Sequence, residues 1–168
     1  MQTWSTPLVA AAAAFLAVLL WRVRPHLPGG RSRASFDALR EARARIEATH
    51  EPRARALALC DAADLTVRGP GGTASAAGLY QRAMRTDPTS AEIVVRTVSG
   101  LAKRPRRLES LLWRHLAAGP WTGEAADASR AALDALRVLH EGPLKNAVRA
   151  RALAHARDAL DGRSKAGG

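Results

Sequence analysis

Five histidines are the side chains of this chain best suited to acid–base chemistry or metal binding. They are widely separated along the sequence, at His26, His50, His115, His140 and His155. No two of them stand one helical turn apart, and no His-Glu-x-x-His motif occurs, so the pattern of a helical metal site is missing. A histidine at a helix end, such as His140, is favourable against the helix dipole. The sequence therefore predicts no metal site.

The only cysteine, Cys60, excludes an intramolecular disulfide and a cysteine-based metal cage. It lies in the apolar-rich run 54–65, which indicates a small core residue. The glycine-rich segment 69–72 lacks the Gly-Lys-Ser/Thr ending of a phosphate-binding loop and is interpreted as a turn. Because no catalytic constellation is evident, the chain is predicted to be non-enzymatic and to use no cofactor.

The densest charged cluster surrounds Pro105, and the chain as a whole is strongly basic. It has 26 basic and 15 acidic residues and a net charge of +11, which favours anionic partners such as lipid headgroups or nucleic acid. Two interpretations stay open, an anion-binding patch and a solvated turn, and abundant arginine and alanine are also typical of a GC-rich genome. The candidate anion contacts in this cluster are Lys103, Arg104, Arg106 and Arg107.

Two tryptophans, Trp113 and Trp121, occur in the C-terminal part of the chain. Trp113 falls off the apolar stripe of its expected helix, so its ring would be available to a partner protein if it is exposed. Packing against a neighbouring helix is the more common arrangement for such a tryptophan. Both tryptophans are therefore candidate partner contacts.

The N-terminal segment 1–21 contains no charged side chain. As a helix it would span roughly 30 Å, the hydrocarbon thickness of a bilayer. Trp4 and Trp21 flank its apolar core, as interfacial tryptophans do. The basic residues after it predict a cytoplasmic C-terminal domain and an N-terminus outside. The candidate headgroup contacts there are Arg22, Arg24, Arg31 and Arg33.

These patterns predict an organisation in four parts: a single-pass transmembrane anchor over 1–24, a basic Pro/Gly linker over 25–34, a helical domain over 35–161 and a disordered tail over 162–168. A cleavable signal peptide is the main alternative to the anchor, but the basic n-region that it requires is missing. A buried soluble helix is a further alternative.

The helical domain is predicted from its high alanine content, its scarcity of β-branched residues and its regular Pro and Gly breaks. Helices are expected over 35–50, 52–68, 73–86, 89–103, 105–118 and 122–140, and a last one follows Pro143. The sequence Thr89-Ser-Ala-Glu92 is a capping box, which marks a helix start. The predicted fold class is all-α, with the N-terminal transmembrane helix followed by an array or bundle of about seven short helices in antiparallel pairs.

The segment 76–88 resembles the second helix of a tetratricopeptide repeat. Ala76, Tyr80, Ala83 and Pro88 occupy the positions of its small residues, its aromatic residue and its closing proline. One repeat length later, Leu108, Leu112 and Pro120 match the same pattern, but His115 occupies the position of the alanine. The tryptophan signature of the first helix of the repeat is missing. The resemblance implies helical hairpins that bind peptide segments of partner proteins on a concave surface.

These observations together favour a membrane-anchored, non-enzymatic protein-interaction module, a scaffold or adaptor that presents a tetratricopeptide-like domain to cytoplasmic protein partners. Two alternatives stay open. One is a membrane-tethered basic protein that binds nucleic acid through its backbone phosphates. The other is an auxiliary subunit of a membrane complex. The sequence indicates no oligomeric state.

Overall fold

The computed structural model describes the backbone of residues 31–69 and 72–166 and the side chains of residues 36–69 and 72–162. Within these ranges the chain forms seven α-helices, one 3₁₀ turn and no strand, which confirms the predicted all-α class. The helices are α2 (Arg31–Ala48), α3 (Pro52–Arg68), α4 (Gly72–Thr86), α5 (Ala91–Leu101), α6 (Pro105–Ala118), α7 (Ala126–Glu141) and α8 (Ala147–Ala166), and the 3₁₀ turn η1 (Gly123–Ala125) precedes α7.

None of the helices in these ranges combines the length and the apolar composition that crossing a bilayer requires. The predicted anchor 1–24 lies outside the described residues.

Several helix boundaries differ from those predicted, and two helices extend into segments that were predicted to be non-helical. Helix α2 begins at Arg31, inside the predicted linker 25–34, because the stretch from residue 31 to residue 48 contains no proline or glycine. Helix α8 continues to Ala166, through most of the predicted disordered tail 162–168. The single Gly162 costs a helix only about 1 kcal/mol, which does not end it.

The capping box predicted at residues 89–92 does not form. Helix α5 begins at Ala91 with Ser90 as its N-cap, and no side chain caps it. The hydroxyl and the amide of Thr89 instead donate to Oδ1 of Asp87, at 2.8 and 3.1 Å. The Thr89 side chain is thus bound to Asp87 and does not cap α5. This arrangement is common because an aspartate carboxylate readily accepts a hydrogen bond from the backbone amide two residues later.

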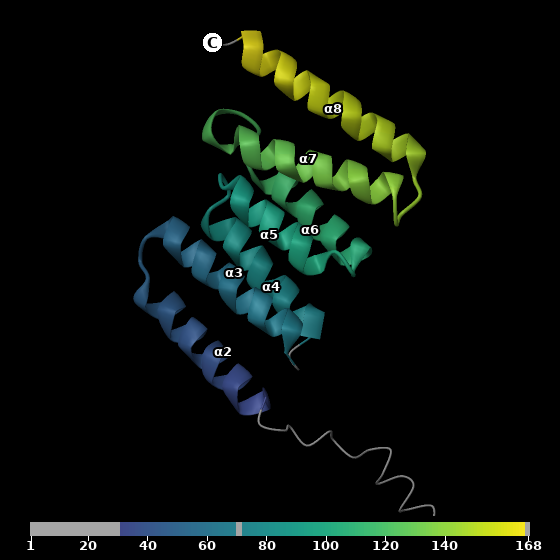
Figure 1. Cartoon of the computed structure of the whole chain (residues 1–168). Helices are drawn as coiled ribbons and strands as arrows, with labels where there is room; N and C mark the ends of the chain where they lie inside the picture. The colour runs from purple at the N-terminus through teal and green to yellow at the C-terminus, as the bar shows by residue number, and fades with distance from the viewer. Residues whose placement is uncertain (1–30, 70–71, 167–168) are drawn as a thin grey trace, which may run out of the picture. The chain divides into compact units, whose positions relative to one another are not determined.

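The helices from Ser35 onward belong to one unit, in which they stack in chain order (Figure 1). Each helix from α3 to α5 packs against both of the two helices that follow it, and α7 packs closely against α8. Helices α6 and α8 lack comparable backbone contact. A space bounded by side chains therefore separates α6 from α8.

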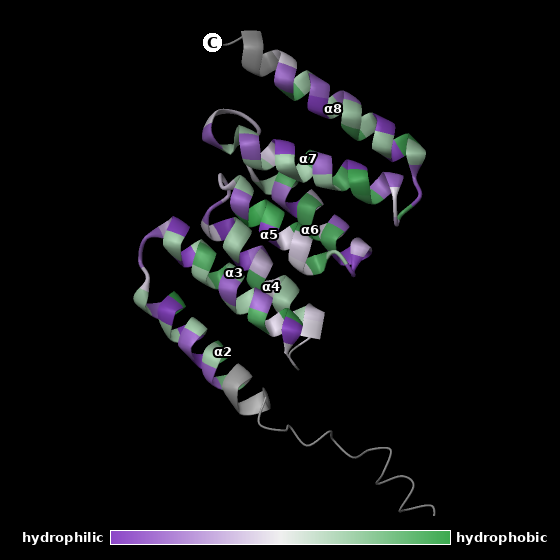
Figure 2. Ribbon diagram, viewed as in Figure 1, coloured by the Kyte–Doolittle hydropathy of each residue, from purple (hydrophilic) through white to green (hydrophobic). Residues whose placement is uncertain are grey.

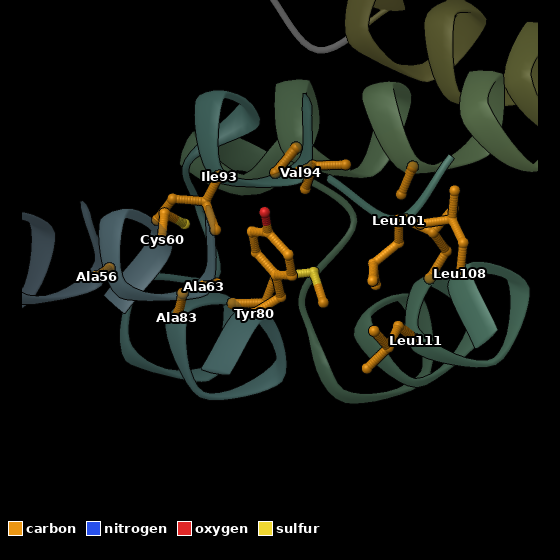
Figure 3. Packing of buried hydrophobic residues seen from close by; sticks show 14 of the residues in the cluster. Ala56, Cys60, Ala63, Tyr80, Ala83, Ile93, Val94, Leu101, Leu108 and Leu111 are labelled. Carbon is orange, nitrogen blue, oxygen red and sulfur yellow. The ribbon is translucent and has the colours of Figure 1, made fainter. Parts of the chain in front are cut away.

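The core is built from small and branched apolar residues that repeat at helical spacing. Figure 2 shows hydrophobic residues interspersed with hydrophilic ones along every helix, so each helix has apolar residues to turn toward its neighbours. Helices α3 and α4 both contribute buried alanines, and Ala63, Ala83 and Ile93 lie beside Tyr80 in the core (Figure 3). All four side chains are fully buried.

Candidate functional site

The side chains suited to chemistry do not converge on one centre. His115 and His140 are buried, whereas His50 and His155 are exposed. Cys60 is fully buried, and burial raises the pKa of its thiol to about 12, so it is a poor nucleophile at neutral pH. Among the residues that the structure describes, no three His, Cys, Asp or Glu side chains are placed to hold one metal ion. His26 lies outside those residues.

An ion-paired cluster connects α3, α4 and α5. Arg96 on α5 donates from Nη2 to Asp61 Oδ1 at 2.7 Å and to Asp64 Oδ2 at 2.5 Å, and both aspartates are on α3. The hydroxyl of Tyr80 on α4 donates to the other oxygen of Asp64. The partners are 16 to 35 residues apart in the sequence, so no local spacing indicates the cluster. It satisfies its own donors and acceptors, which makes it a connection between helices rather than a binding site.

Carboxylates line a recess at the starts of α3, α5 and η1, but most of them are already engaged. The carboxylate of Glu51 accepts hydrogen bonds from two amides in the first turn of α3, and Asp87 holds Thr89. Glu92 lies 4.0 Å from Arg53, and Asp127 lies 2.7 Å from Arg130. These acids therefore cap helices and pair with arginines, and they make no evident cation site.

The predicted basic cluster lies on the surface, where α5 turns into α6. All four of its side chains are exposed, and none pairs with a carboxylate of the described residues. The other predicted anion contacts cannot join them in a described site. Arg22 and Arg24 lie outside the described residues, and the side chains of Arg31 and Arg33 are not described.

Negative charge is distributed unevenly between the helices. Helix α4 carries no acidic residue and α6 carries one, Glu109. The acids within α3, α5 and α7 are all paired with arginines. The exposed surface of α4 and α6 therefore has an excess of positive charge, from arginines that form no ion pair within the described ranges: Arg82, Arg85, Arg106, Arg107 and Arg114.

A first groove of about 390 Å³ runs between α4 and α6. Met84, Leu111 and His115 are its most buried lining residues, and an arginine from each helix, Arg85 and Arg114, also lines it. Burial lowers the pKa of His115, so its imidazole is neutral at physiological pH. This groove is apolar in its depth and positively charged at its edges.

A second groove of about 510 Å³ lies between α6 and α8, where the two helices do not pack directly. Leu133 of α7 and Leu153 of α8 are its buried lining residues, and Trp113 and Trp121 also line it. The indole N–H of Trp121 donates to the carbonyl oxygen of Leu116 at 2.8 Å, which fixes the ring at the end of α6. The two tryptophans are 40% and 38% exposed, so each offers a substantial apolar area to a ligand.

A polar contact ties together the three helices around this second groove. Glu109 of α6 and Arg149 of α8 line the groove and form an ion pair, with Oε1 and Nη1 3.3 Å apart. Oε1 of Glu109 is also 3.3 Å from Nε2 of the buried His140 on α7. This second contact is not a hydrogen bond, and neither ring nitrogen of His140 has a hydrogen-bond partner among the described residues. Glu109 is therefore held within the protein and is not free to pair with a ligand.

The structure thus brings together some of the residues singled out in the sequence and leaves others apart. The two candidate partner contacts, Trp113 and Trp121, share one groove. Ala76, Tyr80 and Ala83 are fully buried in the core, as residues that pack paired helices should be, and Pro88 follows the end of α4. Sequence reasoning missed the contribution of α8, whose Arg149, Leu153 and neighbouring alanines form the opposite wall of the groove.

Comparison with known proteins adds no named relative to this description. No family model, curated protein or solved structure matches the chain, so the functional argument depends on the grooves themselves.

Proposed function

We propose that this chain is a membrane-anchored, non-enzymatic interaction module that holds a protein partner at the cytoplasmic face of a membrane. The observation that carries the proposal is the placement of Trp113 and Trp121 in one apolar groove between α6 and α8. Tryptophan is enriched among the residues that dominate binding energy at protein interfaces. A partly exposed pair that shares a groove is therefore a natural anchor point for a partner.

The packing of the helices supports the same proposal. Each helix from α3 to α5 contacts the next two helices, an order of contacts typical of stacked helical hairpins such as tetratricopeptide repeats. Stacked hairpins leave grooves between neighbouring helices, and proteins of this kind use such surfaces to bind other proteins. The alanines and Tyr80 that carry the sequence resemblance lie in this packing between α3, α4 and α5.

The membrane part of the proposal comes from the sequence. An uncharged stretch of 21 residues has an apolar core flanked by two tryptophans and is followed at once by arginines, which favours a single-pass anchor with the helical domain on the cytoplasmic side. In this arrangement the anchor would restrict the helical domain to the membrane surface. The domain could then recruit a soluble partner or contribute to a membrane complex.

The interaction is tested with a photo-cross-linking amino acid placed in the full-length chain in its source cells. Suitable exposed positions are Ala117 on α6, Val95 on α5 and Ala44 on α2. We expect discrete cross-linked products with a protein. At least one of the three positions should form them, and the three positions should not form them equally. A diffuse smear from every position, products with nucleic acid alone, or no product at all would contradict the proposal.

The anchor is tested separately by fractionation. The full-length chain should stay in the membrane pellet after an alkaline carbonate wash, whereas a variant that lacks residues 1–24 should be released. Protease added to the cytoplasmic side should digest the helical domain, and protease added to the other side should not. Release of the full-length chain by carbonate would contradict a transmembrane anchor.

A further inference from the structure

We infer that the groove between α6 and α8 receives an acidic amphipathic helix of the partner. The apolar side chains of that helix would contact the two tryptophans, and its carboxylates would face Arg106 near the start of α6. This inference rests on the proposed function and adds to it the binding surface and the chemistry of the partner.

The shape of the groove suits the apolar face of a helix. Its buried lining residues, Leu133 and Leu153, come from α7 and α8, and its α8 wall includes the small side chains of Ala152 and Ala156. Small side chains leave room for a partner helix to approach. A hydrophobic depression between two helices is a recurring site for a third, amphipathic one.

The tryptophans supply fixed apolar surfaces in this groove. Because the N–H of Trp121 is already bound to the carbonyl of Leu116, the ring does not need a polar group from the ligand. Its exposed area is therefore best matched by leucine-like or aromatic side chains. Trp113, on the adjacent helix α6, is exposed to the same degree and extends this surface.

The charges around the groove favour a partner that is negatively charged. Arg106 is three residues before Glu109 and seven before Trp113, so it lies on the face of α6 that lines the groove. Arg106 belongs to the exposed basic cluster at residues 103–107, which forms no ion pair within the described residues, whereas Arg114 lines the first groove. A partner with carboxylates beside its apolar residues would neutralise this cluster, and the one acid that lines the groove, Glu109, is already paired with Arg149.

The same features favour a protein segment over a membrane or a nucleic acid. Insertion into a bilayer needs apolar side chains that protrude, whereas these tryptophans are more than half buried and line a recess. Binding of phosphates needs the arginines but gains nothing from the buried leucines in the groove. Only a ligand with both an apolar and an anionic face uses the whole surface.

The test uses the full-length chain in neutral nanodiscs and two fluorescent synthetic peptides. Both peptides form amphipathic helices about five turns long with leucines on one face, and the other face carries glutamates in one peptide and lysines in its twin. Saturable binding of the glutamate peptide, at least about tenfold tighter than binding of the lysine twin, is expected from fluorescence anisotropy. Absence of saturable binding of the glutamate peptide overturns the inference.

Variants place the peptide in the groove. Trp113→Ala should weaken binding of the glutamate peptide by about tenfold or more, since truncated tryptophan anchors commonly cost at least that factor. Val148→Ala removes an exposed apolar residue of α8 outside the groove and should leave binding unchanged. Equal effects of these two variants would overturn the inference.

Charge reversal gives a gain of binding that no folding defect can imitate. Combining Arg106→Glu with Arg149→Glu, which reverses one cation on each wall of this groove, should abolish binding of the glutamate peptide and allow binding of the lysine twin. Arg82→Glu, which changes an unpaired exposed cation on α4, should preserve the original preference. An unchanged preference in the double variant would overturn the inference.

Competition distinguishes the other classes of ligand. Vesicles that contain phosphatidylserine and a short single-stranded oligonucleotide are each added to the complex with the glutamate peptide. If either displaces the peptide and its own binding depends on Trp113, the groove serves lipid or nucleic acid and the inference fails. If the peptide fails while the photo-cross-linker at Val95 captures a protein, the proposed function stands and the binding surface is elsewhere.

Discussion

The hydroxyl of Tyr80 lies where a side chain on Gly100 would have to stand. Tyr80 extends from α4 toward α5, and the same hydroxyl donates a hydrogen bond to Asp64 on α3. Three helices therefore meet at one phenol oxygen, and the ring is fully buried between them (Figure 3). The absence of a side chain at residue 100 is what allows α5 to approach the tyrosine this closely.

Gly100→Ala should destabilise the protein although alanine is the better helix former. The added methyl group would collide with a rigid, buried ring, and such overpacking costs typically about 1–3 kcal/mol in the free energy of unfolding. The control is Gly78→Ala on α4, where an added Cβ meets no atom and should stabilise the helix by up to about 1 kcal/mol. Urea unfolding followed by circular dichroism measures both variants, and equal effects would contradict the close packing of Tyr80 against α5.

Tyr80→Phe should lower the free energy of unfolding by about 1 kcal/mol, a typical value for one lost hydrogen bond. The ring still fills its space, and Arg96 still pairs with Asp64, so the loss should not be larger. Thr86→Val is the control, since the exposed hydroxyl of Thr86 bonds only to the carbonyl of Arg82 in its own helix. A change within about 0.5 kcal/mol is expected there. If both substitutions have the same effect, the hydroxyl of Tyr80 does not stabilise the contact between α3 and α4.

Acidification should destabilise the protein in part through His115. Burial lowers the pKa of this imidazole in the folded protein below its ordinary value of about 6.5. Protons therefore bind the unfolded chain more readily, so this contribution to stability is present above about pH 6.5 and is lost as the pH falls below it. His115→Leu should lose less stability between pH 7.5 and pH 5.5 than the unmodified protein does, as measured by urea unfolding at both pH values. Replacing the exposed His155 by alanine controls for the removal of a histidine, and an unchanged pH dependence in His115→Leu would refute the argument.

The starts of α3 and α6, and the face that α6 turns to the core, can be predicted from local sequence patterns. Pro52 and Pro105 open their helices as expected, because proline fits the first helical turn. The leucines at 108, 111, 112 and 116 share one face at helical spacing and are buried. Trp113 falls off that face and is accordingly exposed. Periodicity thus places Trp113 off the buried face, but it does not exclude packing against a neighbouring helix, which is the favoured interpretation from the sequence alone.

The groove itself does not follow from local patterns. Glu109 and Arg149 are 40 residues apart, and only the packing of α7 against both α6 and α8 brings them within 3.3 Å. The same holds for Arg96 and Asp61, which lie 35 residues apart. Sequence spacing reports which side of one helix a residue occupies, but the angle at which the next helix crosses depends on all the side chains between them. For this reason the tryptophans could be identified singly but not as a pair in one groove.

Cys60 offers a direct measure of how tightly the centre of the core is closed. Its side chain is fully buried, so a reagent cannot reach it in the folded state. Burial also raises the pKa of the thiol to about 12, so the reactive thiolate does not form at neutral pH. A thiol-reactive dye at pH 8 should therefore modify the native protein only through unfolding. The labelling rate should rise with urea in parallel with the unfolded fraction measured by circular dichroism.

The Gly100→Ala variant provides an internal comparison for this measurement, because it should loosen the contact between α4 and α5 next to the cysteine. We expect faster labelling of Cys60 in that variant than in Gly78→Ala at the same urea concentration, by the factor that separates their unfolding equilibria. The reasoning holds only if the thiol is reached through opening of the helix stack. Rapid stoichiometric labelling of the native protein without urea would show instead that α3 and its neighbours leave Cys60 accessible, and the packing described around Tyr80 would then be wrong.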